Sequence, residues 1–209
     1  MQICSRIAIF FDATSLLIGI FFLSLPKMSR SMHETGKHIE TSSNNNNIHI
    51  HDTTMNIGDK IPEMLGIDQD GHEIKASDYR GRKIVLYSYP KANTSGCTAE
   101  ACSLQAHKDE LAAAGYEIIG VSKDKQAAQK KFAEAQGLQF PLIADTETAL
   151  LQQLGCWGEK VACGRKTIGT LRTTYLVDED GRIEKIFTPK EIKTYKNDMY
   201  KLLSDSGCL

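Results

Sequence analysis

A buried-strand pattern that stops at a proline and leads into a helix is the feature that most restricts how this chain can fold. Residues 83–89, Lys-Ile-Val-Leu-Tyr-Ser-Tyr, are apolar, aromatic and β-branched, which predicts a strand that ends before Pro90. Asn93 or Thr94 can cap the next element, a helix that we expect to extend to about Ala114, where a glycine follows.

Strand and helix patterns then alternate along the chain, which predicts a largely parallel sheet with covered faces. A hairpin and a helix close the chain, and another hairpin precedes the first strand. The resulting expectation is an α/β protein with a thioredoxin-like fold, in which helices flank a central mixed β-sheet. The further expected elements are strands over 116–121 and 140–144, helices over 125–136 and 146–154, a hairpin of 172–177 with 182–187, a helix over 189–203, and the early hairpin over 58–75 with its turn at 68–71.

The N-terminal region differs in composition from the rest of the chain. Residues 1–27 are mainly apolar, residues 28–54 read as a disordered polar linker, and residues 55–209 read as the folded domain. The apolar segment is open to three interpretations: a secretory signal, a membrane anchor, or non-native sequence upstream of a true start at Met55. Asp12 weighs against the first two, because a carboxylate is costly in hydrocarbon. We therefore expect a cytoplasmic protein, with export or anchoring through residues 7–25 as the alternative.

Charge is balanced, with 25 Lys and Arg against 26 Asp and Glu. No stretch builds the basic face that a nucleic-acid-binding protein needs, so we expect no nucleic acid and instead small-molecule or protein partners. His49 and His51 alternate within the linker but lack a third ligand at suitable spacing, so we interpret them as solvated residues and expect no metal.

Six unevenly spaced cysteines point to redox or metal chemistry rather than to a disulfide framework. A domain of this size can bury its own core and does not depend on disulfide staples. The six are Cys4, Cys97, Cys102, Cys156, Cys163 and Cys208.

Cys97 lies where the strand over 83–89 has ended and the next helix begins. Ligands of α/β sheets bind at the carboxyl ends of strands, and a helix N-terminus favours an anion such as a thiolate, which is the nucleophilic form of cysteine. We expect the hydroxyl of Thr94 to point into the same cavity, and Gly96 to allow close backbone approach with its N–H free for a substrate. Pro90 would fix the turn and shield the sulfur. Each residue alone could simply form a turn before a core cysteine, but their joint spacing favours a reactive site.

The pattern Pro-x-x-x-Thr-x-x-Cys at 90–97 resembles the active-site motif of the peroxiredoxins. The longer run at 89–102 is similar to the bacterioferritin comigratory protein (PrxQ) branch of that family. The similarity extends from about Met55 to Leu203 and includes residues 68–71, 158–160 and 172–178. It implies a thiol-specific peroxidase that needs neither a metal nor an organic cofactor.

The resemblance also implies residue roles. Cys97 corresponds to the peroxidatic cysteine, Cys102 to the resolving cysteine, Thr94 to the threonine that holds the peroxide, and Arg172 to the arginine beside the thiolate. Glu100 falls one turn after Cys97 and could orient Arg172, although a helix-surface glutamate is the alternative interpretation.

The implied cycle reduces hydrogen peroxide and organic hydroperoxides to water and alcohols, in antioxidant defence and cell redox homeostasis. The Cys97 thiolate becomes a sulfenic acid, Cys102 condenses with it to a disulfide, and thioredoxin reduces that disulfide. Residues five apart on a helix have Cα atoms about 8–9 Å apart, whereas a disulfide needs about 4.4–6.8 Å. The helix must therefore unwind locally. The resemblance also favours a monomer.

Several residues depart from the branch pattern. Ser95 stands where proline is frequent, Ala92 where aspartate is frequent, and Ser88 where an aromatic residue is frequent. None of these changes removes a group from the proposed reaction.

The remaining cysteines leave alternatives open. Cys156 and Cys163 could be spare thiols, a second resolving pair or, as we expect, packing residues, while an exposed Cys208 could form intermolecular disulfides. Two other functions compete with the peroxidase. One is a dithiol oxidoreductase, which usually has Cys-x-x-Cys, and the other is a zinc protein that uses the four cysteines from Cys97 to Cys163.

Overall fold

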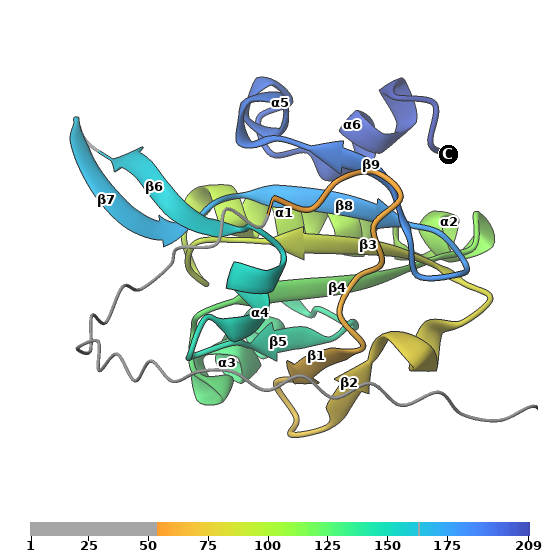
Figure 1. Ribbon diagram of the computed structural model, residues 1–209, viewed down its shortest axis with the longest axis horizontal. Helices are drawn as coiled ribbons and strands as arrows, with labels where there is room; N and C mark the ends of the chain where they lie inside the picture. The colour runs from red at the N-terminus through yellow and green to blue at the C-terminus, as the bar shows by residue number, and fades with distance from the viewer. Residues whose placement is uncertain (1–53, 163) are drawn as a thin grey trace, which may run out of the picture. The chain divides into compact units, whose positions relative to one another are not determined.

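A five-stranded mixed sheet in the order β5-β4-β3-β8-β9 forms the centre of the fold (Figure 1). The computed structural model describes residues 54–162 and 164–209. Three neighbouring strands pair in parallel, and the other two join the sheet through antiparallel pairings, β8 with β3 and β9 with β8. This arrangement confirms the expected α/β architecture with a mixed sheet. The parallel strands are β3 (Lys83–Ser88), β4 (Tyr116–Ser122) and β5 (Leu142–Ala144), and the antiparallel ones are β8 (Thr173–Val177) and β9 (Ile183–Phe187).

The two faces of the sheet carry separate hydrophobic cores, because successive residues of a strand point to opposite faces. On β3, Val85 and Tyr87 join the core beneath most of the helices, whereas Ile84 and Leu86 join the other. The first face is covered by α1 (Ser95–Ala106), α2 (Lys108–Ala113), α3 (Gln126–Gln136), α5 (Pro189–Thr194) and α6 (Met199–Asp205). The second is covered by α4 (Ala149–Gln153) and the early hairpin of β1 (Met64–Ile67) and β2 (Glu73–Lys75), which leads into a short 3-10 helix at Ala76–Tyr79.

The expected helix, which was to follow a cap at Asn93 or Thr94 and extend to about Ala114, is divided into α1 and α2, so that prediction was too long. α1 ends at His107, whose backbone leaves the helical range with φ −116° and ψ 24°. The imidazole of His107 stacks on the ring of Tyr200 in α6, with centroids 3.7 Å apart. This tertiary contact accompanies the break, and α2 begins at the next residue.

The expected closing helix over 189–203 is also divided. Lys196 and Asn197 both adopt left-handed backbone conformations, with φ of 54° and 64°, between α5 and α6. Asp198 then caps α6, because its carboxylate accepts from the Lys201 N–H at 3.1 Å. The Asn-Asp pair was a helix-boundary signal in the sequence.

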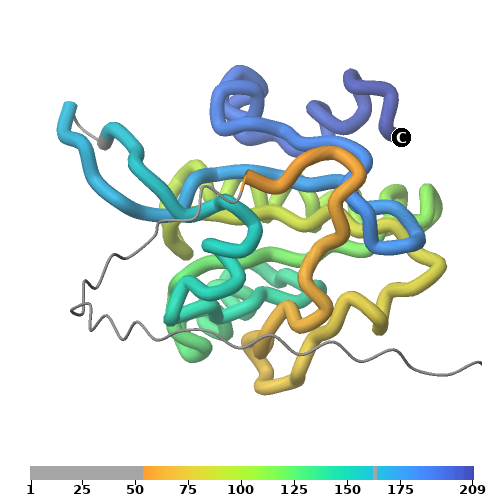
Figure 2. The backbone as a smooth tube through the Cα atoms, viewed as in Figure 1, coloured from red at the N-terminus to blue at the C-terminus, as the bar shows by residue number. Residues whose placement is uncertain are grey.

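A second hairpin, β6 (Trp157–Ala162) with β7 (Arg165–Thr170), was missed by the sequence analysis. Figures 1 and 2 show it extending away from the central sheet. Val161 and Ile168 are 70% and 66% exposed, so its pattern is not that of a half-buried strand pair. Its second strand ends two residues before β8, so Arg172 lies in a connection and not, as expected, at the start of a strand.

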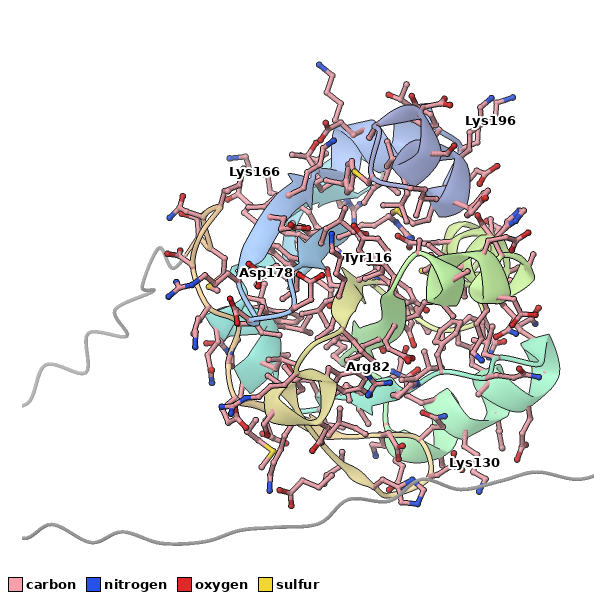
Figure 3. All side chains as sticks on the ribbon, turned by 90° about the vertical axis from the view of Figure 1, so that its right-hand side faces the viewer. Arg82, Tyr116, Lys130, Lys166, Asp178 and Lys196 are labelled. Carbon is pink, nitrogen blue, oxygen red and sulfur yellow. The ribbon has the colours of Figure 1, made fainter. Side chains whose placement is uncertain are left out.

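Positive side chains are distributed over different elements of the described chain. Figure 3 labels Lys130, Lys166 and Lys196, which point outward from α3, from β7 and from the connection between α5 and α6.

The expectations for residues 1–53 concern sequence outside the described residues, and so does Cys163. The division into segments 1–27, 28–54 and 55–209 stays a prediction. Within residues 54–162 and 164–209, no helix has the length and apolar character that crossing a bilayer requires.

Gly120 in β4 is packed so closely that the structure leaves no room for a side chain. A Cβ at this position would lie 2.7 Å from Leu142 Cδ2 and 2.9 Å from the Tyr87 ring. We expect Gly120→Ala to lower the free energy of unfolding by about 1–3 kcal/mol, because the core must shift to accept the methyl group. Urea unfolding measures this. Gly158→Ala is the matched control, since its nearest neighbour, Leu171 Cδ1, lies at 3.5 Å. Equal losses for both variants would contradict the packing argument.

Candidate active site

The loop that precedes α1 is held between the carboxyl ends of β3 and β4. The Tyr89 N–H donates to the Val121 carbonyl at 3.0 Å, and the Ala92 N–H donates to Asp124 Oδ2 at 2.6 Å. Asn93 adopts a left-handed conformation with φ 58°, which asparagine tolerates better than most residues. These contacts carry the chain from half-buried Pro90 to the start of α1, as the sequence predicted.

The first turn of α1 has no side-chain cap. Thr94 is the N-cap residue, with φ −98° and ψ 147°, but its side chain makes no capping hydrogen bond. Its hydroxyl donates to the Lys91 carbonyl at 2.9 Å, and the residue is exposed. The structure thus pairs the proton of this hydroxyl with the loop backbone, and the expected contact of Thr94 with a peroxide at Cys97 stays a prediction. The N–H groups of the first turn, which have no intrahelical partner, are left for an anion.

Arg172 joins the two parts of the site. Its Nη2 donates to Cys97 Sγ at 3.0 Å, and its Nη1 donates to Glu100 Oε2. Cys97 is 1% exposed and the side chain of Glu100 is fully buried, so Glu100 is no helix-surface residue and that alternative is wrong. Charge-assisted hydrogen bonds of this kind are the strong ones, and they stabilise a negative sulfur.

Gly96 lies beside Asn197 and Arg172. A Cβ at residue 96 would lie 3.3 Å from Asn197 Nδ2 and 3.5 Å from Arg172 Nη2. The contact with Asn197 would be tighter than usual, whereas the contact with Arg172 would be an ordinary van der Waals contact. The expected role of Gly96, close backbone approach with its N–H free for a substrate, stays a prediction.

Burial and the neighbouring charges act against each other on the pKa values of Glu100 and Arg172, and burial prevails only for Glu100. It raises the pKa of Glu100 to about 7, although the positive charge of Arg172 and its hydrogen bond act to lower it. The second carboxylate oxygen, Oε1, has no hydrogen-bond partner, in keeping with an acid that is hard to ionise. For Arg172, burial lowers the pKa, but Glu100 and Cys97 outweigh it and hold the pKa above its usual value, so the guanidinium stays charged.

Tyr87 lies near the same charges and stays protonated. Burial raises the pKa of its phenol well above the usual value, and the neighbouring Tyr89, Glu100 and Cys97 raise it further. Its hydroxyl is buried without a hydrogen-bond partner. The phenol is therefore no base for proton transfer near neutral pH.

Cys102 lies on α1 with Cys97, as expected, and both thiols are free. Its half-buried thiol donates to Gln136 Oε1 of α3 at 3.5 Å. Both cysteines belong to one continuous helix, so the helical spacing of about 8–9 Å between Cα atoms applies and the disulfide cannot form without unwinding.

The other described cysteines lie apart from Cys97. Cys156 is fully buried, and burial raises the pKa of its thiol, which lies 3.4 Å from the Tyr175 hydroxyl. Cys208 is half-buried beside Lys185 Nζ at 3.5 Å, so it is less exposed than expected. Among residues 54–162 and 164–209, no three or more His, Cys, Asp or Glu side chains gather as a metal site. The zinc alternative also needs Cys163, which lies outside those ranges.

Two residues that organise the site were not found from the sequence. Asp124 accepts a hydrogen bond from the Ala92 N–H. It follows β4 at the same edge of the sheet as the Cys97 loop, and this position after a strand could have indicated its role in the sequence. Asn197 lies over Gly96 from the connection between α5 and α6. That contact depends on tertiary structure alone.

The amino-acid sequence is similar to that of known proteins over most of the described residues. Residues 57–186 match the model of the AhpC/TSA family. Peroxiredoxin Bcp of Escherichia coli (strain K12) is 40% identical over 133 residues, which cover 64% of this chain and 85% of that protein. Peroxiredoxin Bcp of Bacillus subtilis (strain 168) is 37% identical over 152 residues, which cover 73% of this chain and 97% of that protein.

Solved structures agree with the sequence relatives. A cysteine-to-serine mutant of PrxQ from Xylella fastidiosa has a TM-score of 0.63 at 25% identity, over 73% of this chain and 98% of that one. Peroxidoxin BcpB from Mycobacterium tuberculosis has a TM-score of 0.62 at 28% identity, over 72% and 95%. A structure that concerns alkyl peroxide reduction by the Xanthomonas campestris bacterioferritin comigratory protein has a TM-score of 0.60 at 26% identity, over 71% and 99%. These similarities confirm the thioredoxin-like fold.

The raised pKa of Glu100 predicts a pH dependence of stability. Between the usual value of 4.5 and about 7, the folded protein keeps a proton that the unfolded chain releases, so stability falls as pH rises through this window. We expect the free energy of unfolding to lose on the order of 1–3 kcal/mol there. Glu100→Gln should lack this part of the slope in urea unfolding measured from about pH 5 to about pH 8.

Glu134→Gln, on the exposed side of α3, is the matched control and should keep the wild-type slope. Identical slopes for wild type and Glu100→Gln would show that Glu100 ionises normally in the folded protein.

Proposed function

Because this chain belongs to the AhpC/TSA family and is a peroxiredoxin, a thiol-dependent peroxidase, we propose that Cys97 is the thiolate that reduces the hydroperoxide. The observation that carries this assignment is the 3.0 Å hydrogen bond from Arg172 Nη2 to Cys97 Sγ at an uncapped helix N-terminus. Both the guanidinium and the free N–H groups stabilise negative charge, on the sulfur before reaction and on the peroxide oxygens during it.

The proposed first step is a displacement at oxygen. The sulfur of Cys97 forms a bond to one peroxide oxygen, the O–O bond breaks, and the leaving oxygen takes a proton to become water or an alcohol. Sulfur is oxidised to sulfenic acid and the peroxide is reduced by two electrons. Arg172 stays cationic and bonded to Glu100, so it can serve both the sulfur and the leaving oxygen.

The second step joins Cys97 and Cys102. The thiol of Cys102 attacks the sulfenic sulfur and releases water, leaving a disulfide. We propose that a thioredoxin-type dithiol then reduces this disulfide by exchange. Organic hydroperoxides are included as substrates because the Xanthomonas campestris relative is described as reducing alkyl peroxides. The monomeric state and the cytoplasmic location expected from the sequence stay predictions.

Disulfide formation requires one half of α1 to unwind, and the two halves are held by different contacts. The half after Cys102 is anchored: Ser103 Oγ donates to Asp198 Oδ1 at 2.8 Å, the Tyr200 N–H donates to Ser103 Oγ at 3.1 Å, and His107 stacks on Tyr200. The half with Cys97 is held by Arg172. That hold weakens when the charged thiolate becomes a neutral sulfenic acid. We therefore propose that residues 95–101 unwind toward Cys102.

Cysteine variants test the assignment of the two thiols. We expect Cys97→Ser to abolish peroxide consumption in a coupled assay with thioredoxin, thioredoxin reductase and NADPH, because the attacking sulfur is gone. Cys102→Ser should still react with one equivalent of peroxide but should stall recycling. Cys208→Ser is the control and should match the wild type, since the thiol of Cys208 lies beside Lys185 Nζ of β9 and has no part in the proposed cycle. Activity in Cys97→Ser would overturn the proposal.

Hydrogen exchange tests which half of α1 unwinds. In the disulfide form, we expect amides 95–101 to lose more protection than amides 103–106, because only the second group keeps its anchors on α6. Mass spectrometry of reduced and oxidised protein measures this. Greater loss in residues 103–106 would reverse the proposed direction, and unchanged exchange throughout 95–106 would exclude unwinding.

A further inference from the structure

Ser88 occupies a decisive place at the end of β3. It is 2% exposed, and it immediately precedes the loop that leads to Cys97. Serine stands here where an aromatic residue is frequent in the PrxQ branch, and Ser88 has no role in the catalytic cycle proposed above. Its hydroxyl makes three hydrogen bonds to the backbone on either side of Arg172, and it also interacts with the buried thiol of Cys156.

These contacts bracket Arg172. Ser88 Oγ lies 2.7 Å from the Leu171 carbonyl and 3.2 Å from the Thr173 carbonyl, and it accepts from the Thr173 N–H at 3.1 Å. A hydroxyl has one proton to donate and lone pairs to accept, so it can serve a carbonyl and an N–H at once. The hydroxyl thus ties the residue before Arg172 and the residue after it to the end of β3.

The position of Arg172 makes this tie consequential. Arg172 lies in the two-residue connection between β7 and β8, outside the regular hydrogen bonds of either strand. Its guanidinium must reach Cys97 Sγ at 3.0 Å and Glu100 at the same time. Hydrogen bonds weaken steeply with poor distance and angle, so a small backbone shift at residue 172 would lose one of the two contacts.

From these observations we infer that Ser88 is a positioning residue of the peroxidase site, acting through Arg172. Its hydroxyl links β3, which delivers Cys97, to the segment that delivers Arg172 from 75 residues further along the chain. The inference rests on the proposed role of Cys97. Leu171 has a second anchor, because its N–H donates to the Cys156 carbonyl at 2.7 Å, so the loss of Ser88 displaces Arg172 without releasing it.

The test compares Ser88→Thr with Ser88→Val, because the two side chains share a shape and differ only in the hydroxyl. The readouts are the rate of Cys97 oxidation by hydrogen peroxide in a single turnover and the rate of Cys97 alkylation by iodoacetamide at neutral pH. We expect Val to be slower than Thr by about 5- to 50-fold, below the roughly 100-fold that a 1 Å misplacement can cost. Ser88→Ala, which adds no bulk, repeats the comparison against wild type if the larger side chains prevent folding.

Two controls make the outcome specific. Thr174→Val removes a buried hydroxyl of β8 that has no hydrogen-bond partner, and it should react like the wild type. In an Arg172→Ala background the difference between Ser88→Thr and Ser88→Val should vanish, since the serine then has nothing to position.

Equal rates for Ser88→Thr and Ser88→Val would overturn the inference, and so would an undiminished difference in the Arg172→Ala background. Failure of the proposed function shows itself separately, as peroxide consumption that survives Cys97→Ser. The two claims can therefore fail independently.

Discussion

The site proposed for this peroxiredoxin is built around one guanidinium, that of Arg172, which bonds to the sulfur of Cys97 and to the buried carboxyl group of Glu100. Removing charges from water is costly unless they are paired and hydrogen-bonded, and here the guanidinium is the partner of both the sulfur and the carboxyl group. The sheet order makes the pairing possible. β8 runs antiparallel to β3, so the start of β8 lies at the end of β3, where the Cys97 loop begins. Ser88 ties these two ends together.

In the cycle that we propose, α1 favours the reaction of Cys97 with the peroxide and opposes the disulfide step that follows. In α1 the backbone presents free N–H groups to Cys97, and it also holds Cys102 too far away for a disulfide. The anchors on Ser103 and His107 come from α6, so the C-terminal helices bear on how α1 can unwind. The sulfur changes from an anion to a neutral sulfenic acid on oxidation, which weakens the contact with Arg172. Oxidation itself therefore favours the rearrangement that resolution requires.

Sequence patterns predicted the parts of the fold that have strong local signals. The strands at 83–88 and 116–122 lie where expected, because burial on both faces leaves a continuous apolar stretch in the sequence. The turn at 178–181 also lies where expected, between β8 and β9. The break at His107 and the division between α5 and α6 were missed in an otherwise helical pattern. Both coincide with contacts between segments about 90 residues apart in the chain, such as the His107–Tyr200 stack, which no local propensity reports.

For the site, the sequence by itself determined the chemistry: which cysteine begins a helix after a strand, and which glycine, threonine and proline surround it. Those features depend on residue type and short spacing, which a sequence displays directly. Only the tertiary structure decided that Thr94 bonds to Lys91, that Glu100 is buried against Arg172, and that Ser88 holds the backbone beside Arg172. The physical reason is distance along the chain, since a contact between residues 88 and 171 or 100 and 172 exists only once the sheet has formed. Burial then sets its strength, and burial is a property of the folded molecule.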